Sequence, residues 1–125
     1  MGNLSKHFDS VEFACPCCGA VVIDDDLIVQ LERLREYLGR YGGGPIHINS
    51  GFRCFDHNTA VGGVRNSQHL YGKAADITVV GVSPFRVQDA ADLIFSDGGM
   101  GRYNTFTHVD VRGHRARWDQ RSSRQ

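Results

Sequence analysis

Residues 67–76 read Ser-Gln-His-Leu-Tyr-Gly-Lys-Ala-Ala-Asp and mark the point where a long polar loop becomes a strand. On a single helix, His69 and Asp76 would lie about 10 Å apart along the axis. That separation is too large for both side chains to bind one metal ion. Gly72 lies between them and favours a turn of the chain. We therefore expect His69 on a loop and Asp76 at the start of the following strand.

A second polar segment, Phe106-Thr-His-Val-Asp110, supplies another histidine. With the two-residue period of a strand, His108 and Asp110 share one face with Arg112, which is too polar to be an ordinary core face. We interpret it as the face of a site. Two histidines and a carboxylate are ligands that zinc accepts, and three protein ligands leave a fourth position open for water. The candidate zinc ligands are His69, Asp76 and His108.

The remaining pattern predicts a small α+β domain. Acidic residues 24–26 begin a helix that ends at the glycines of 42–44, and Ser83-Pro84 begins a second helix that runs to about Ser96. Strands are predicted at 46–50, 74–80 and 105–112, with a long loop at 51–67. We expect a small antiparallel sheet with packed helices. The predicted apolar face of the first helix comprises Leu27, Leu31, Leu34, Leu38 and Tyr41.

Length and charge fit a single domain over residues 1–125, with residues 1–23 as a cysteine-containing N-terminal arm and 119–125 as a flexible tail. The 14 basic and 14 acidic residues balance, which does not favour nucleic acid as a partner. No apolar run in the sequence approaches the ~20 residues that span a bilayer. Because residues 1–7 lack an apolar core, we expect no secretory signal in them. We expect a monomer. Tyr103 and Trp118 are predicted to pack in the core or at its rim, with stacking on a sugar or peptide as the alternative role.

Five short motifs occur in one order along the chain: SGFRC at 50–54, HN at 57–58, VGG at 61–63, SxHxxGxAxD at 67–76 and HVD at 108–110. Together they resemble the peptidase M15 family of zinc D-alanyl-D-alanine carboxypeptidases and related peptidoglycan peptidases, phage endolysin domains included. The resemblance covers about 13–118 and implies a hedgehog/DD-peptidase-like fold.

The resemblance also implies a function and a set of site residues. The function is that of a zinc metallopeptidase, a hydrolase that cleaves peptidoglycan stem peptides or cross-links as a carboxypeptidase or endopeptidase at the cell wall or in the periplasm. The metal ligands would be His69, Asp76 and His108. Arg53 would lie near the carbonyl and carboxylate of the substrate, where a guanidinium stabilises negative charge.

The segment before His108 departs from the family's pattern. Many members place the general base, His or Glu, two or three residues before the last histidine ligand, where this chain has Phe106 and Thr105. Asp110 is either a substitute base or a carboxylate that orients a ligand or Arg53, and we favour the orienting role. His57 is a further candidate for proton transfer or substrate contact, with loop ordering as its alternative role. A missing base leaves a second function open, a non-catalytic zinc-stabilised module that binds the cell wall or belongs to a phage structure.

The four cysteines, Cys15, Cys17, Cys18 and Cys54, have three interpretations. They are a disulfide from the N-terminal group to Cys54, a structural zinc site in which His57 is an added candidate ligand, or free buried thiols. We favour the disulfide, because a cell-wall enzyme works outside the cytoplasm. Either link would fix the loop that carries Arg53.

Overall fold

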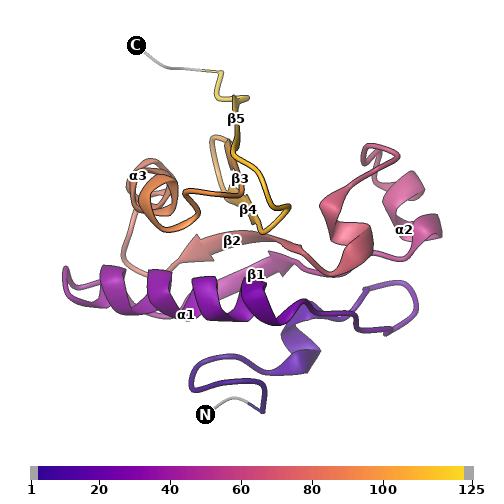
Figure 1. Ribbon diagram of the computed structural model, residues 1–125, viewed down its shortest axis with the longest axis horizontal. Coiled ribbons are helices and arrows are strands. Elements are labelled where there is room, and N and C mark those ends of the chain that lie inside the picture. Colours follow the sequence, from indigo (N-terminus) through magenta and orange to yellow (C-terminus); the bar gives the residue numbers. More distant parts are fainter. Residues whose placement is uncertain (1–2, 123–125) are drawn as a thin grey trace.

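The computed structural model describes residues 3–122, and within them it has one five-stranded sheet and three α-helices (Figure 1). The helices are α1 (Asp25–Gly39), α2 (Phe55–Ala60) and α3 (Pro84–Ile94). Two short 3-10 helices are η1 (Ser10–Phe13) and η2 (Gln68–Tyr71). The strands are β1 (Ile46–Ser50), β2 (Ala74–Val79), β3 (Gly99–Arg102), β4 (Thr107–Asp110) and β5 (Ala116–Asp119). These elements confirm the predicted α+β class.

Capping residues begin the two long helices where the sequence predicts. Asp24 accepts a hydrogen bond from the backbone N–H of Asp26 at the start of α1, and Ser83 accepts one from Arg86 at the start of α3. Predicted leucines of α1 join one core with side chains of β1, β2 and α3. Tyr41 does not belong to this face, because α1 ends at Gly39 and the Tyr41 side chain turns out into solvent.

The prediction of an antiparallel sheet is wrong at one edge, because β5 runs parallel to β3. The strand order is β1-β2-β4-β3-β5, and the other three pairings are antiparallel. Neither β3 nor β5 is predicted from the sequence, since the Gly-Met-Gly-Arg sequence of β3 has glycines that are rare in strands. Gly101 is nevertheless required there: an added Cβ would lie 2.3 Å from the indole nitrogen of Trp118.

The predicted tail begins inside the sheet. Asp119 is the last residue of β5, and the backbone N–H of Gln120 donates to the carbonyl of Arg102 at 2.7 Å. Ser122 donates its backbone N–H to the side chain of Asn104. Residues 123–125 of the predicted tail lie outside the described residues.

The register of the sheet lines up five residues, one from each strand. Asp76 of β2 lies opposite both Ser50 of β1 and His108 of β4, and His108 lies opposite Gly101 of β3. Gly101 in turn lies opposite Trp118 of β5. Directly opposed residues point to the same face of a sheet. One row across the sheet therefore carries two of the three candidate zinc ligands and an aromatic neighbour.

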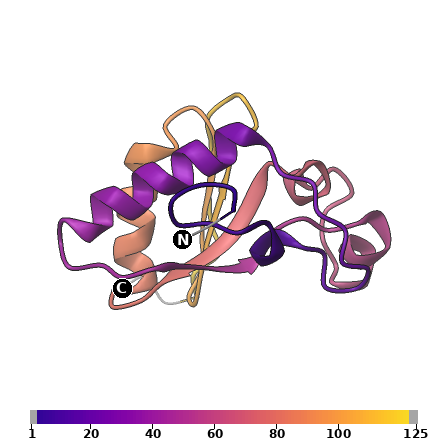
Figure 2. The same cartoon turned by 90° about the horizontal axis from the view of Figure 1, so that it is seen from below.

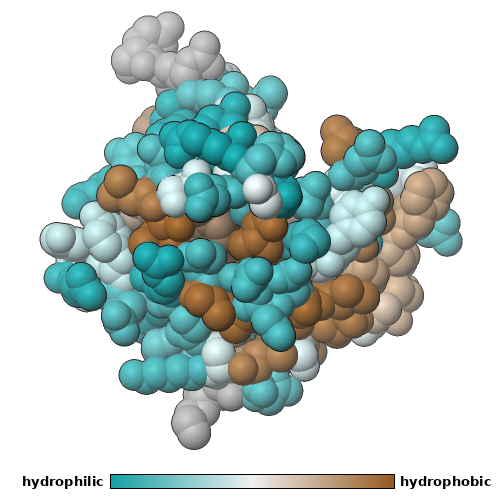
Figure 3. All heavy atoms as spheres, viewed as in Figure 1, coloured by the Kyte–Doolittle hydropathy of each residue, from teal (hydrophilic) through white to brown (hydrophobic). Residues whose placement is uncertain are grey.

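The helices divide between the two ends of the molecule. Figures 1 and 2 show α1 and α3 packed together near one end, while α2, η2 and the loop of the N-terminal arm gather at the other. On the face seen in Figure 3, hydrophobic residues are interrupted by hydrophilic ones. Among residues 3–122, no helix combines the length and the apolar character needed to cross a bilayer.

Gln88 of α3 fixes the turn between β3 and β4. Its fully buried amide donates to the backbone carbonyls of Tyr103 at 2.8 Å and Phe106 at 3.1 Å. We expect Gln88→Ala to lower the free energy of unfolding by about 2–3 kcal/mol, because two carbonyls lose their donor and a cavity remains. The neighbouring exposed Asp89→Ala should cost no more than about 0.5 kcal/mol. Urea denaturation measures both, and equal small losses would contradict this role for Gln88.

Candidate metal centre

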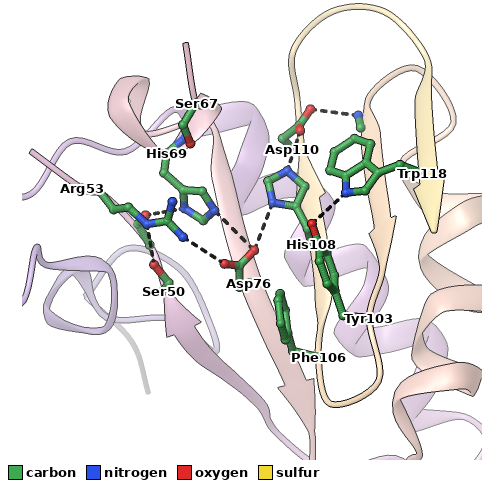
Figure 4. Close-up of polar contacts among 12 residues, drawn as sticks. Ser50, Arg53, Ser67, His69, Asp76, Tyr103, Phe106, His108, Asp110 and Trp118 are labelled. Atoms are coloured by element: carbon green, nitrogen blue, oxygen red, sulfur yellow. Dashed lines mark hydrogen bonds and ion pairs between the residues drawn. The ribbon is translucent and has the colours of Figure 1, made fainter. Parts of the chain in front are cut away.

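The structure brings the three candidate ligands together from three different elements. His69 comes from η2, Asp76 from β2 and His108 from β4, and one ligand atom of each lies within 4.8 Å of the others (Figure 4). All three side chains are buried. Gly72 ends η2 with a φ of 68°, a left-handed conformation that glycine adopts without strain. The turn between His69 and Asp76 that the sequence predicts is therefore present.

Hydrogen bonds select the nitrogen that each histidine presents. The Nδ1 atom of His69 lies 2.7 Å from the carbonyl oxygen of Gly51, which can only accept, so Nδ1 carries the proton. The Nε2 atom of His108 lies 2.7 Å from Oδ2 of Asp110 and donates in the same way. The other nitrogens, Nε2 of His69 and Nδ1 of His108, lie 3.3 and 3.0 Å from Oδ1 of Asp76. When both rings are neutral, three lone-pair donors converge on one point.

This convergence fits a divalent cation. Burial raises the pKa of Asp76, but hydrogen bonds and charge attraction from His108 and His69 in their protonated forms outweigh it and hold the pKa well below its usual range. Burial lowers the pKa of His108, yet its hydrogen bonds to Asp110 and Asp76 outweigh that effect and raise it. The pocket thus attracts positive charge, and two imidazoles with one carboxylate form a donor set that zinc accepts.

Asp110 lies behind His108 and is completely buried. Its Oδ2 accepts from His108 and from Nη2 of Arg112, both at 2.7 Å, and its Oδ1 accepts from the backbone N–H of Gly99 at 2.8 Å and from Nε of Arg112 at 2.9 Å. Burial raises its pKa, but the bonds to His108 and Arg112 outweigh this and keep the carboxyl ionised. Such a carboxylate holds a histidine in one tautomer and orientation. It does not line the cleft described below.

Arg53 connects the loop after β1 to the ligand set. Its guanidinium donates to Oδ2 of Asp76 at 3.3 Å, to Oδ1 of Asn58 at 3.2 Å and to Oγ of Ser50 at 3.3 Å. Its backbone N–H donates to the carbonyl of His69 at 3.1 Å. Arg53 therefore holds the carboxylate that both histidines face.

The ligands lie in a cleft of about 920 Å³. Tyr103 and Phe106 line it, with their rings stacked at 4.3 Å between centroids, and so does Trp118, whose indole N–H donates to the Tyr103 hydroxyl at 2.9 Å. The Trp118 ring centre lies 5.0 Å from that of His108. The sequence predicted packing roles for Tyr103 and Trp118 and did not place them beside the ligands, because β5 carries no recognisable strand pattern.

His57, a candidate for proton transfer, is on α2 and does not belong to the residues that line the cleft. Thr105 is exposed and is also absent from that lining. Among the described residues that line the cleft, the histidine and carboxylate side chains are those of the three candidate ligands. The cleft therefore presents no separate imidazole or carboxylate to act as a base.

A family model described as Peptidase M15 matches residues 6–110. The chain belongs to the peptidase M15 family. The match confirms the resemblance that the five motifs predicted.

Two curated relatives share parts of this M15 domain. A zinc D-Ala-D-Ala carboxypeptidase of Streptomyces albus G is 42% identical over 50 residues, which are 40% of this chain and 20% of that protein. A probable peptidoglycan L,D-endopeptidase, MepK, of Haemophilus influenzae is 30% identical over 96 residues, 71% of this chain and 50% of that protein. The aligned part of the M15 domain thus spans no more than half the length of these relatives.

The contact between Asp110 and His108 yields a test of the metal centre. We expect Asp110→Asn to raise the zinc dissociation constant of the His69/Asp76/His108 site by about 10–100-fold, because His108 loses the charge that orients it. Chelator competition measures this, with His69→Ala protein as the reference that lacks the site. The exposed Asp97→Asn is the control and should leave the constant unchanged. Equal zinc affinities for Asp110→Asn and the unmodified protein would contradict the orienting role.

Proposed function

We propose that this M15 domain is a zinc-dependent peptidase that hydrolyses peptidoglycan stem peptides or cross-links, with a D-amino acid at the scissile bond. One observation carries the proposal: Nε2 of His69, Oδ1 of Asp76 and Nδ1 of His108 converge in an open cleft, with Arg53 bonded to the carboxylate. The names of the two relatives, a zinc D-Ala-D-Ala carboxypeptidase and a probable peptidoglycan L,D-endopeptidase, suggest the substrate class.

Bound zinc would polarise the scissile carbonyl and lower the pKa of water toward ~7. Arg53 is suited to bind negative charge on the substrate. Within residues 3–122 its side-chain hydrogen bonds use three N–H groups, one each to Ser50, Asn58 and Asp76. A guanidinium has five N–H donors, so two remain for a terminal carboxylate or for the developing oxyanion.

The aromatic wall of the cleft, formed by Tyr103, Phe106 and Trp118, is suited to exclude water and orient the substrate. Tyr103 accepts the Trp118 N–H, which leaves its own hydroxyl proton available as a donor to a bound peptide. Phe106, at one of the two positions where many family members carry the base, stacks on Tyr103. We propose that these side chains position the peptide, while Asp110 keeps the Nδ1 lone pair of His108 directed at the metal position.

The absence of a base among the described residues that line the cleft favours a second function. Because Phe106 and Thr105 occupy the usual positions of the base and the cleft lining offers no substitute, the domain also fits a non-catalytic zinc module that binds the cell wall. A general base contributes typically 10²–10⁴-fold to a rate. Turnover by the peptidase should therefore be slow, whereas a binding module should show none.

Incubation of the zinc-loaded protein with purified peptidoglycan separates the two functions. We expect new amino termini or released D-alanine, and a fall of about 10³-fold or more with His69→Ala or a chelator, since both remove the Lewis acid. The exposed His114→Ala is the matched histidine control and should keep full activity. A folded, zinc-loaded protein that binds sacculi but releases nothing would overturn the peptidase proposal and support the binding module.

Arg53 also offers a test of the bond that is cleaved. If its guanidinium binds a terminal carboxylate, Arg53→Lys should lower kcat/KM by about 10²-fold for a peptide ending in D-Ala-D-Ala, because a lysine ammonium cannot bind the carboxylate bidentately. The C-terminal amide of the same peptide is the control, and its smaller kcat/KM should change little. Equal losses on both peptides would assign Arg53 to the oxyanion or to Asp76 alone.

A further inference from the structure

Four cysteine sulfurs meet at the end of the molecule that carries α2 and the loop of the N-terminal arm. Cys15, Cys17 and Cys18 come from that arm and Cys54 precedes α2, and all four Sγ atoms lie within 4.8 Å of one another. The sulfur of Cys17 lies 3.5 Å from that of Cys15 and 3.2 Å from that of Cys54, and Cys15 and Cys54 are 3.7 Å apart. The four are free thiols in the structure. The disulfide favoured from the sequence is therefore not the arrangement found.

These separations match a tetrahedral metal site. Zinc–sulfur bonds of about 2.3 Å place the corners of a tetrahedron about 3.8 Å apart, close to the distances seen. A disulfide would join two sulfurs at about 2.0 Å, much closer than the separations of 3.2, 3.5 and 3.7 Å found among Cys15, Cys17 and Cys54. From this geometry we propose that Cys15, Cys17, Cys18 and Cys54 bind a second, structural zinc ion, separate from the His69/Asp76/His108 centre.

The backbone of the arm is folded to present these thiols. The N–H of Gly19 donates to the carbonyl of Cys15 at 2.7 Å, and the N–H of Cys15 donates to Ala20 at 2.8 Å. Gly19 has a φ of 77°, which closes the turn and sets Cys17 and Cys18 beside Cys15. The turn is therefore a tight knuckle that supplies three ligands from one short segment.

Backbone donors also point at two of the sulfurs. The N–H of Cys54 lies 3.5 Å from Sγ of Cys15, and the N–H of His57 lies 3.4 Å from Sγ of Cys54. Such bonds stabilise the thiolate form, which is the form that binds metal. His57, considered from the sequence as an added ligand, contributes its backbone here, and its ring does not belong to the ligand group. Four cysteines already complete the closed coordination of a structural zinc site.

The second zinc would clamp the arm onto the loop that serves the first centre. Phe13 of the arm accepts a hydrogen bond from the backbone N–H of Phe52 at 2.9 Å, and Gly51 passes so close that an added Cβ would lie 2.7 Å from the Cα of Phe13. Gly51 supplies the carbonyl that orients His69, and Arg53 directly precedes Cys54. The arm therefore holds both ends of the segment that carries these two groups, one end through Phe13 and the other through Cys54 of the cysteine site.

Metal counting tests the proposal independently of any hydrolysis. We expect two zinc ions per chain in the unmodified protein by native mass spectrometry and elemental analysis, and one in Cys17→Ser/Cys18→Ser, whose altered side chains are exposed. His69→Ala should also retain one zinc. With cobalt in place of zinc, His69→Ala should keep the intense near-ultraviolet thiolate-to-cobalt absorption, and the double serine variant should lose it. The thermal midpoint of that variant should fall by roughly 10 °C.

His57→Ala is the control and should keep both zinc ions and the cobalt absorption. If Cys17→Ser/Cys18→Ser keeps the zinc of the His69/Asp76/His108 centre, the variant is folded. If it loses both ions, circular dichroism shows whether it has unfolded. An unmodified protein with one zinc and a mass two hydrogens lower for each disulfide would overturn the proposal. So would equal zinc content in the unmodified protein and a folded double serine variant.

Discussion

The pairing of Asp76 with His108 across β2 and β4 is the constraint on which the site depends. Because side chains alternate between the two faces of a strand, a shift of one residue would turn His108 away from Asp76. The same row continues to Ser50 on one side, and to Gly101 and Trp118 on the other. Gly101 matters as much as the polar residues, since its missing side chain is the space that the Trp118 indole fills beside His108.

Hydrogen bonds behind the ligands determine which nitrogen each histidine presents to the metal position. The carbonyl of Gly51 and the carboxylate of Asp110 each hold one N–H of a histidine, so the opposite nitrogens face Asp76. Arg53 holds the other oxygen of Asp76. The three lone pairs are kept in place by contacts that do not depend on the metal, which makes the centre preorganised. Against the effect of burial, the carboxylates of Asp76 and Asp110 beside His108 raise the pKa of that histidine.

The two candidate zinc sites differ as catalytic and structural sites generally do. One has three ligands from different elements at the floor of an open cleft, and the other has four sulfurs and no open position. They share a segment, because Gly51 and Arg53 serve the first site and Cys54 serves the second. In such an arrangement, the arm before α1 contributes to the site through the loop that it holds, although none of residues 3–23 lines the cleft.

Local sequence patterns determined the caps of α1 and α3, strand β1, the family, and the residue types of the three candidate ligands. Tertiary structure alone decided which nitrogen each histidine presents, because the partners of His69 and His108 are a distant carbonyl and a carboxylate seen only after folding. It also decided the parallel pairing of β5 and the position of Trp118. The glycines of β3 make that strand hard to recognise in the sequence, and the Trp118 side chain of β5 fills the space that Gly101 leaves. The gathering of four thiols around Cys54 has the same origin: contacts between distant segments leave no period in the sequence.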